Sequence, residues 1–156
     1  MNTLLTAIML WLTCNFDLPV VYERPRVEFV PAVEITLLRY GPLLSAEKRH
    51  EVLAQYRNNM AMGEPREVVA VYIDTTKTIF LPEEWTGDSP AELSILVHEM
   101  VHHLQNLAGE KFACLQERET LAYAAQNRWL GLFGHDLERD FKIDPMTLLV
   151  STHCVN

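Results

Sequence analysis

Apolar side chains recur at helical spacing over the first fourteen residues, and threonines lie off this stripe. The stripe consists of Leu4, Leu5, Ile8 and Leu12. The pattern predicts an amphipathic helix that packs on the rest of the protein. The segment lacks the basic start and the cleavage site of a signal peptide, and it is too short for a membrane span. We therefore expect a cytoplasmic protein if this N-terminus is native, and an exported one if a signal peptide was trimmed.

Between this helix and residue 65, the pattern predicts one strand and one further helix. Residues 17–31 hold three prolines around a short apolar run, which is typical of extended chain with a strand over Val27–Val30. The residues from Ser45 to about Asn59 predict a helix with Ser45 as its N-cap. Gly63–Pro65 predicts a loop.

Two β-rich runs follow, Val68–Ile73 and Thr78–Leu81, and the turn-like residues Asp74–Lys77 separate them. Both runs contain β-branched and aromatic residues, which pack well on a pleated sheet. Together they predict a β-hairpin, and Pro82 ends its second strand.

The clearest helix start in the sequence comes shortly after the hairpin. Ser89 is the predicted N-cap, Pro90 occupies the first helical position, and Glu92 completes an S-x-x-E capping box. This helix is predicted to end near Ala108, where Gly109 caps it.

A second long helix is predicted from about Ala113 to Leu130, and short helical pieces are predicted over 136–141 and after the Asp-Pro pair at 144–145. The order of elements predicts an α+β fold in a single domain over residues 1–156. Its expected parts are a small antiparallel sheet, a hairpin packed on the first long helix, and a second long helix antiparallel to the first.

Composition and charge narrow the class of partner. The chain has 156 residues and a net charge of −8, and its lysines and arginines are scattered. This distribution argues against nucleic acid or a membrane surface as the main partner. The three cysteines form no C-x-x-C pair, which argues against a cysteine zinc site. Cys114 and Cys154 either form a disulfide or stay reduced like Cys14, and the sequence favours neither state.

Residues 98–102 carry the strongest chemical signal. They read H-E-M-V-H, and on a helix His98 and His102 lie one turn apart on the same face. Two imidazoles in this arrangement can bind one Zn²⁺ ion. Glu99, next to the first ligand, can act as a general base on water that the metal activates. The motif therefore predicts one zinc ion per chain, with His98 and His102 as ligands.

The rest of this helix is predicted to be mostly buried. The expected core stripe consists of Leu93, Leu96, Met100, Leu104 and Leu107. A separate face would line a cleft with Ser94, Ile95, His98, His102 and Gln105. His103 points about 100° away from His102, so we expect it at the cleft rim or the surface and not as a ligand.

A catalytic zinc needs a third protein ligand, and the second long helix offers Glu117 and Glu119. Antiparallel helices joined by a turn near 109–112 bring both carboxylates level with His102. Glu119 is the predicted ligand because its face of the helix carries small or polar residues and no cation. A solvated helix carboxylate is the alternative for either residue.

Three further side chains are candidates around the ion. Tyr123, one turn beyond Glu119, could orient a ligand or donate to an oxyanion, or it could be a core aromatic residue. Gln105 and Gln126 could meet across the two helices beside the site.

With H-E-M-V-H at 98–102 and E-T-L-A-Y at 119–123, the sequence resembles a gluzincin-type zincin metallopeptidase. That clan often has an Asp four residues after the ligand Glu, and this chain has Tyr123 there. The stretch TIFLPEEWTGDSPAELSILVHEMVHHLQN also resembles a bacterial family of short, uncharacterised H-E-x-x-H proteins, and the likeness extends over residues 66–154. The resemblance implies a minimal zincin-like domain. It also implies that Thr78–Leu81 is an edge strand that pairs with an extended peptide.

The function implied by this resemblance is zinc-dependent hydrolysis of peptide bonds in a peptide or protein substrate. His98, His102 and Glu119 would hold the ion, and Glu99 and Tyr123 would be the catalytic residues. One alternative is a catalytically inactive metal-binding interaction module of the same fold. Another is a structural helical domain in which the motif is accidental.

Overall fold

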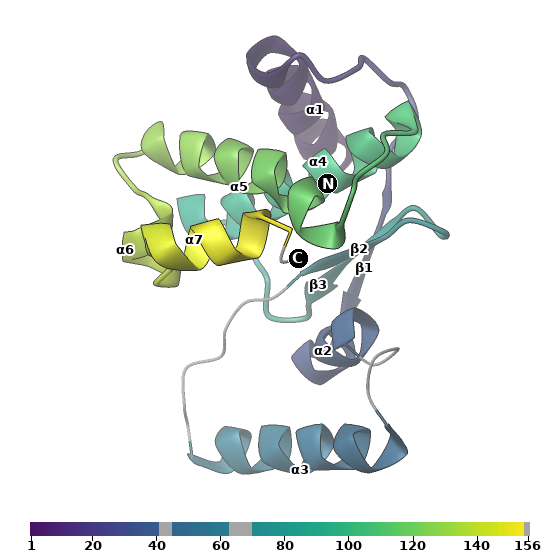
Figure 1. The fold of residues 1–156 in the computed structure, drawn as a ribbon, viewed down its shortest axis with the longest axis vertical. Coiled ribbons are helices and arrows are strands. Elements are labelled where there is room, and N and C mark those ends of the chain that lie inside the picture. Colours follow the sequence, from purple (N-terminus) through teal and green to yellow (C-terminus); the bar gives the residue numbers. More distant parts are fainter. Residues whose placement is uncertain (41–44, 63–69, 155–156) are drawn as a thin grey trace.

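The computed structural model describes residues 1–40, 45–62 and 70–154, and these residues form seven helices and three strands (Figure 1). The predicted α+β class is confirmed. In chain order the elements are α1 (Asn2–Phe16), β1 (Arg26–Val30), α2 (Ala32–Tyr40), α3 (Ala46–Met62), β2 (Val71–Ile73), β3 (Thr78–Pro82), α4 (Pro90–Ala108), α5 (Leu115–Gly131), α6 (Leu137–Phe141) and α7 (Pro145–Thr152).

The three strands form one mixed sheet in the order β1-β3-β2. The predicted hairpin is confirmed, since β2 and β3 pair antiparallel with Tyr72 opposite Ile79. The prediction of an antiparallel sheet is wrong, because β1 pairs parallel with β3. A parallel pair joins strands that are distant in sequence, and no local pattern could reveal this one. Val68 and Val69 lie outside the described residues.

The strand expected at the sheet edge is the central one. β3 has β1 on one side and β2 on the other, and four of its five residues are buried. The prediction that Thr78–Leu81 is an edge strand is therefore wrong. The run TIFLP lacks the alternation of a strand with one wet face, which agrees with a strand covered on both faces. Among the described residues, the open edges belong to β1 and β2.

The N-terminal helix packs on the body as predicted. Leu5, Ile8 and Leu12 of α1 are fully buried, and α1 contacts α4. Among the described residues no helix has the length and apolar character needed to cross a bilayer.

The helix α2 was not predicted. Pro31 O accepts hydrogen bonds from Glu34 N and Ile35 N and so closes its first turn. Ile35 is the one buried residue of α2, so the helix shows no apolar stripe. The following α3 was predicted, and Ser45 Oγ accepts from Lys48 N at 3.3 Å as an N-cap. The predicted loop Gly63–Pro65 lies outside the described residues.

The helix α4 begins and ends as its capping residues predict. Ser89 Oγ accepts from Glu92 N at 3.1 Å, and the Glu92 carboxylate accepts from Ser89 N at 3.4 Å. Gly109 adopts the left-handed conformation, with φ 67°, that ends the helix. The fully buried apolar side chains of α4 are Leu96, Val97, Met100, Val101 and Leu104.

The helices α4 and α5 run antiparallel, as predicted. His98 contacts Gln126, whereas Gln105, further along α4, contacts Arg118, which lies earlier in α5. The two helices therefore run in opposite directions. The predicted helical tail is present as α6 and α7. A disulfide joins Cys114, the N-cap residue of α5, to Cys154 after α7.

The disulfide should account for a large share of the stability. It closes a loop with a sequence separation of 40 residues, and removing such a link costs roughly 2–4 kcal/mol. We expect Cys154→Ser to lower the free energy of unfolding in urea by that amount. Cys14→Ser is the matched control, because Cys14 is an exposed free thiol. Equal stability of Cys154→Ser and Cys14→Ser would contradict this expectation.

Candidate metal centre

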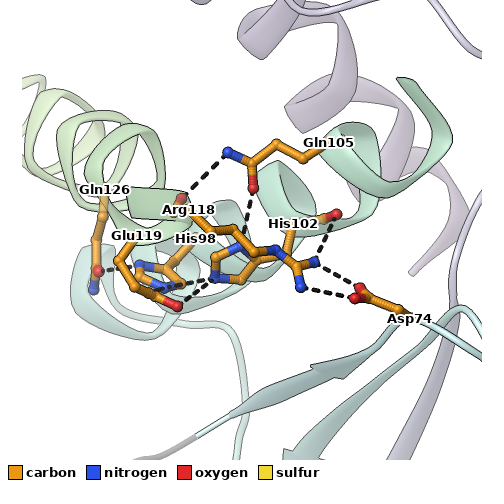
Figure 2. Close-up of polar contacts among 7 residues, drawn as sticks. All are labelled: Asp74, His98, His102, Gln105, Arg118, Glu119 and Gln126. Atoms are coloured by element: carbon orange, nitrogen blue, oxygen red, sulfur yellow. Dashed lines mark hydrogen bonds and ion pairs between the residues drawn. The ribbon is translucent and has the colours of Figure 1, made fainter. Parts of the chain in front are cut away.

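The helix α4 places its two motif histidines side by side beneath α5. His98 and His102 are 6% and 7% exposed, so both rings are almost fully buried. Their Nε2 atoms lie 3.2 Å apart (Figure 2). This spacing follows from their positions one helical turn apart, and it directs two potential ligand atoms at one point.

The third group comes from α5. Glu119 Oε2 lies 3.0 Å from His98 Nε2, and Glu119 Oε1 lies 3.4 Å from His102 Nε2. The predicted juxtaposition of Glu119 with the two histidines is therefore observed. Glu117 is not brought to the cluster: its Oε2 accepts from Ala113 N at 2.6 Å, next to the start of α5.

The spacing of these three groups fits a zinc ion. Zinc ligands at 2.0–2.1 Å in a tetrahedron lie about 3.3 Å from one another. The observed separations of 3.2, 3.0 and 3.4 Å agree with that value. Two imidazoles and one carboxylate are also a usual ligand set of catalytic zinc, which keeps a fourth position open. The residues present therefore fit the metal.

The electrostatics of the cluster also favour a cation. Burial disfavours the charged carboxylate, but hydrogen bonds from His102 and His98 hold the pKa of Glu119 far below its usual range. Burial likewise disfavours a charged imidazole, yet the nearby Glu119 and Glu99 raise the pKa of His102. A positive charge at this point is stabilised, whether it is a proton or a metal ion.

Glu99 and Tyr123 border the cluster without belonging to it. The Glu99 side chain is 5% exposed, and its charge acts on His102. The Tyr123 ring packs edge-on against the His98 ring, with centroids 4.8 Å apart. Burial and the Glu119 charge raise the pKa of Tyr123. Tyr123 therefore keeps its proton and can donate a hydrogen bond.

A cation near the site was missed by the sequence reasoning. Arg39, at the end of α2, is an exposed residue whose guanidinium lies over the Tyr40 ring, 5.8 Å from its centroid. Partial desolvation opposes its charge, but Tyr40, Glu99 and Glu119 outweigh this and raise the pKa of Arg39. Because α2 itself carried no clear pattern, the sequence offered no signal for this residue.

The two glutamines expected to meet each other instead bind one histidine each. His98 Nδ1 donates to Gln126 Oε1 at 3.0 Å, and His102 Nδ1 donates to Gln105 Oε1 at 3.1 Å (Figure 2). The prediction that they lie beside the site is confirmed, and the prediction that they contact each other is not.

An ion pair ties the helix of the third ligand to the hairpin. Both terminal nitrogens of Arg118 donate to the carboxylate of Asp74, at 2.8 and 2.6 Å, and one of them also donates to His102 O (Figure 2). Asp74 follows β2 directly. The residue next to Glu119 is thereby fixed to α4 and to the sheet at once.

His103 is not at the surface, so that prediction is wrong. Its side chain is fully buried, its Nε2 donates to Glu23 O at 2.9 Å, and its Nδ1 accepts from the Tyr72 hydroxyl at 3.1 Å. Burial lowers the pKa of His103, which therefore stays neutral in this network. The expectation that it is not a ligand agrees with this placement, since His103 faces β2 and not Glu119.

The comparisons place the chain in a family. The family described as a domain of unknown function (DUF6647) matches residues 42–156. The chain belongs to this family. No curated protein and no solved structure matches it. The matched part of this DUF6647 protein contains α4 and α5, and hence every residue of the cluster, but the family's description assigns no activity.

Proposed function

We propose that this protein is a zinc-dependent metallopeptidase that hydrolyses peptide bonds. The observation that carries the proposal is the convergence of His98 Nε2, His102 Nε2 and the Glu119 carboxylate at spacings of 3.0–3.4 Å. The second support is Glu99, a residue of α4 next to His98 that is 5% exposed and whose charge acts on His102.

Each residue has a defined task in this proposal. His98, His102 and Glu119 hold the zinc ion. When bound, zinc acts as a Lewis acid that acidifies water and polarises the scissile carbonyl. Glu99 takes the proton of the attacking water and passes it to the leaving amine. Tyr123, which keeps its proton, donates to the oxygen on which negative charge develops.

The substrate strand would lie along β2 and not along β3. Among the described residues β2 pairs only with β3, so its other edge is open. The strand packs on α4 through Tyr72, and Asn106 of α4 donates to Asp74 O at its end. An extended peptide added at this edge would satisfy the free main-chain groups of β2 and pass close to the helix that bears the histidines.

Metal analysis combined with a cleavage assay tests the proposal. We expect about one zinc ion per chain in the purified protein, cleavage of members of a mixed peptide library, and loss of cleavage on chelation that zinc restores. A protein without zinc affinity would overturn both the metal site and the enzyme. A protein with one zinc ion and no cleavage would instead support the alternative of an inactive metal-binding interaction module.

A further inference from the structure

We infer that Gln105 and Gln126 are positioning residues that hold both histidines as Nδ1–H tautomers, through hydrogen-bond relays that end at main-chain carbonyls. The role of the relays in metal binding rests on the proposed function. The hydrogen bonds that form the relays are contacts observed within the chain. No pattern around either glutamine predicted them.

The relay behind His98 has three links. In the structure Ser94 Oγ donates its proton to Ala91 O at 2.7 Å, and in this arrangement it accepts from Gln126. The amide nitrogen of Gln126 therefore donates to Ser94 Oγ at 3.3 Å, and its amide oxygen must face the imidazole. Since an amide oxygen only accepts, the proton between Gln126 and His98 belongs to His98 Nδ1.

The relay behind His102 is shorter and more rigid. Arg118 O is a main-chain carbonyl and has no proton to give. The amide nitrogen of Gln105 donates to it at 3.2 Å. The amide oxygen of Gln105 therefore accepts from His102 Nδ1 at 3.1 Å. Both Gln105 and Gln126 are almost fully buried, at 2% and 4% exposure, so water does not compete with either relay.

The two relays have a common effect on the ligand atoms. With Nδ1 protonated in His98 and His102, Nε2 is the nitrogen of each ring that is left to bind a metal ion, and the two Nε2 atoms lie 3.2 Å apart. Histidine ligands commonly have a carboxylate or a carbonyl behind them. Here both supports are neutral amides. Glu119 is then the one negative ligand, and a divalent ion keeps a net positive charge in the cluster.

The relays differ in what they tolerate, and this difference makes the inference testable. In Gln126→Glu the new carboxylate can still accept from His98, because the Ser94 hydroxyl can turn from Ala91 O and donate to it. In Gln105→Glu a carboxylate oxygen would face Arg118 O, which cannot turn or donate. The same substitution should therefore be tolerated at position 126 and harmful at position 105.

The experiment compares zinc affinity, by competition with a chelator, in four variants and a control. We expect Gln126→Glu to bind zinc within a few-fold of the wild type, and Gln105→Glu to bind at least ~10-fold more weakly. Gln105→Leu and Gln126→Leu should each lose ~10–100-fold. Gln55→Glu, at an exposed position of α3, controls for the added charge. Visible spectra of the cobalt-loaded proteins should change in the variants that lose affinity and stay unchanged in Gln126→Glu.

A second readout does not need the metal. In metal-free protein, nitrogen NMR should show Nδ1 protonated in both His98 and His102, because each Nδ1 faces an amide oxygen. Equal zinc affinities of Gln105→Glu and Gln126→Glu, or rings without a proton on Nδ1, would overturn the inference while leaving a zinc peptidase intact. A wild type that binds no zinc but shows Nδ1–H rings would support the relays and refute the proposed function.

Discussion

Glu99→Gln should retain zinc and lose peptide hydrolysis by ~10²–10⁴-fold in kcat, the usual contribution of a general base. The amide has nearly the shape of the carboxylate but cannot accept a proton at neutral pH. Glu99 is buried beside the cluster and none of its contacts holds His98 or His102 in place, so the ligands should stay as they are. The measurement is kcat together with bound zinc per chain.

A control variant away from the site checks that a substitution elsewhere leaves zinc content and hydrolysis unchanged. His50→Gln, at an exposed position of α3, is a suitable reference for expression and zinc content. Hydrolysis by Glu99→Gln at the wild-type rate would remove Glu99 from the mechanism, even if zinc is present.

Glu119→Ala should weaken zinc binding by more than ~100-fold, since even supporting residues behind a ligand are worth 10–100-fold. The variant leaves two histidines, whose Nε2 atoms then face each other without the carboxylate that completes the cluster. Zinc affinity by chelator competition is the measurement.

Glu117→Ala is the matched variant for this test, because it removes the same group two residues away. Glu117 accepts from Ala113 N and contacts neither histidine. Zinc affinity should therefore equal that of the wild type, with a small loss of stability at the start of α5. Similar losses of zinc in both variants would mean that Glu119 acts through the helix and not as a ligand.

Local signals in the sequence predicted the helices that carry the site. The ends of α4 are set by Ser89 and Pro90 at its start and by Gly109 at its end. Each acts on main-chain groups close to it in the sequence, so a local pattern predicts it. The spacing of His98 and His102 then follows from helix geometry alone. Counting residues on either side of the turn was sufficient to bring Glu119 level with them.

Contacts between distant segments could not be predicted in this way. The parallel pairing of β1 with β3 depends on a crossover of more than forty residues, and no local pattern reports it. His103 can be buried because the Tyr72 hydroxyl donates to its Nδ1 and the main-chain carbonyl of Glu23 accepts from its Nε2. Those partners lie 31 and 80 positions away in the sequence, so the helical period of α4 alone misplaced His103.

The disulfide between Cys114 and Cys154 also affects Glu119, the proposed third ligand. Helix ends open and close more readily than helix centres, and Glu119 lies only five residues after Cys114, at the edge of the part of α5 that would fray. The covalent link to Cys154 suppresses this fraying, and Thr120 Oγ1 adds a hydrogen bond to Thr152 O. If the proposed metal site is correct, we expect the link to the C-terminal helix α7 to slow the release of the ion, although α7 supplies none of the three proposed ligands.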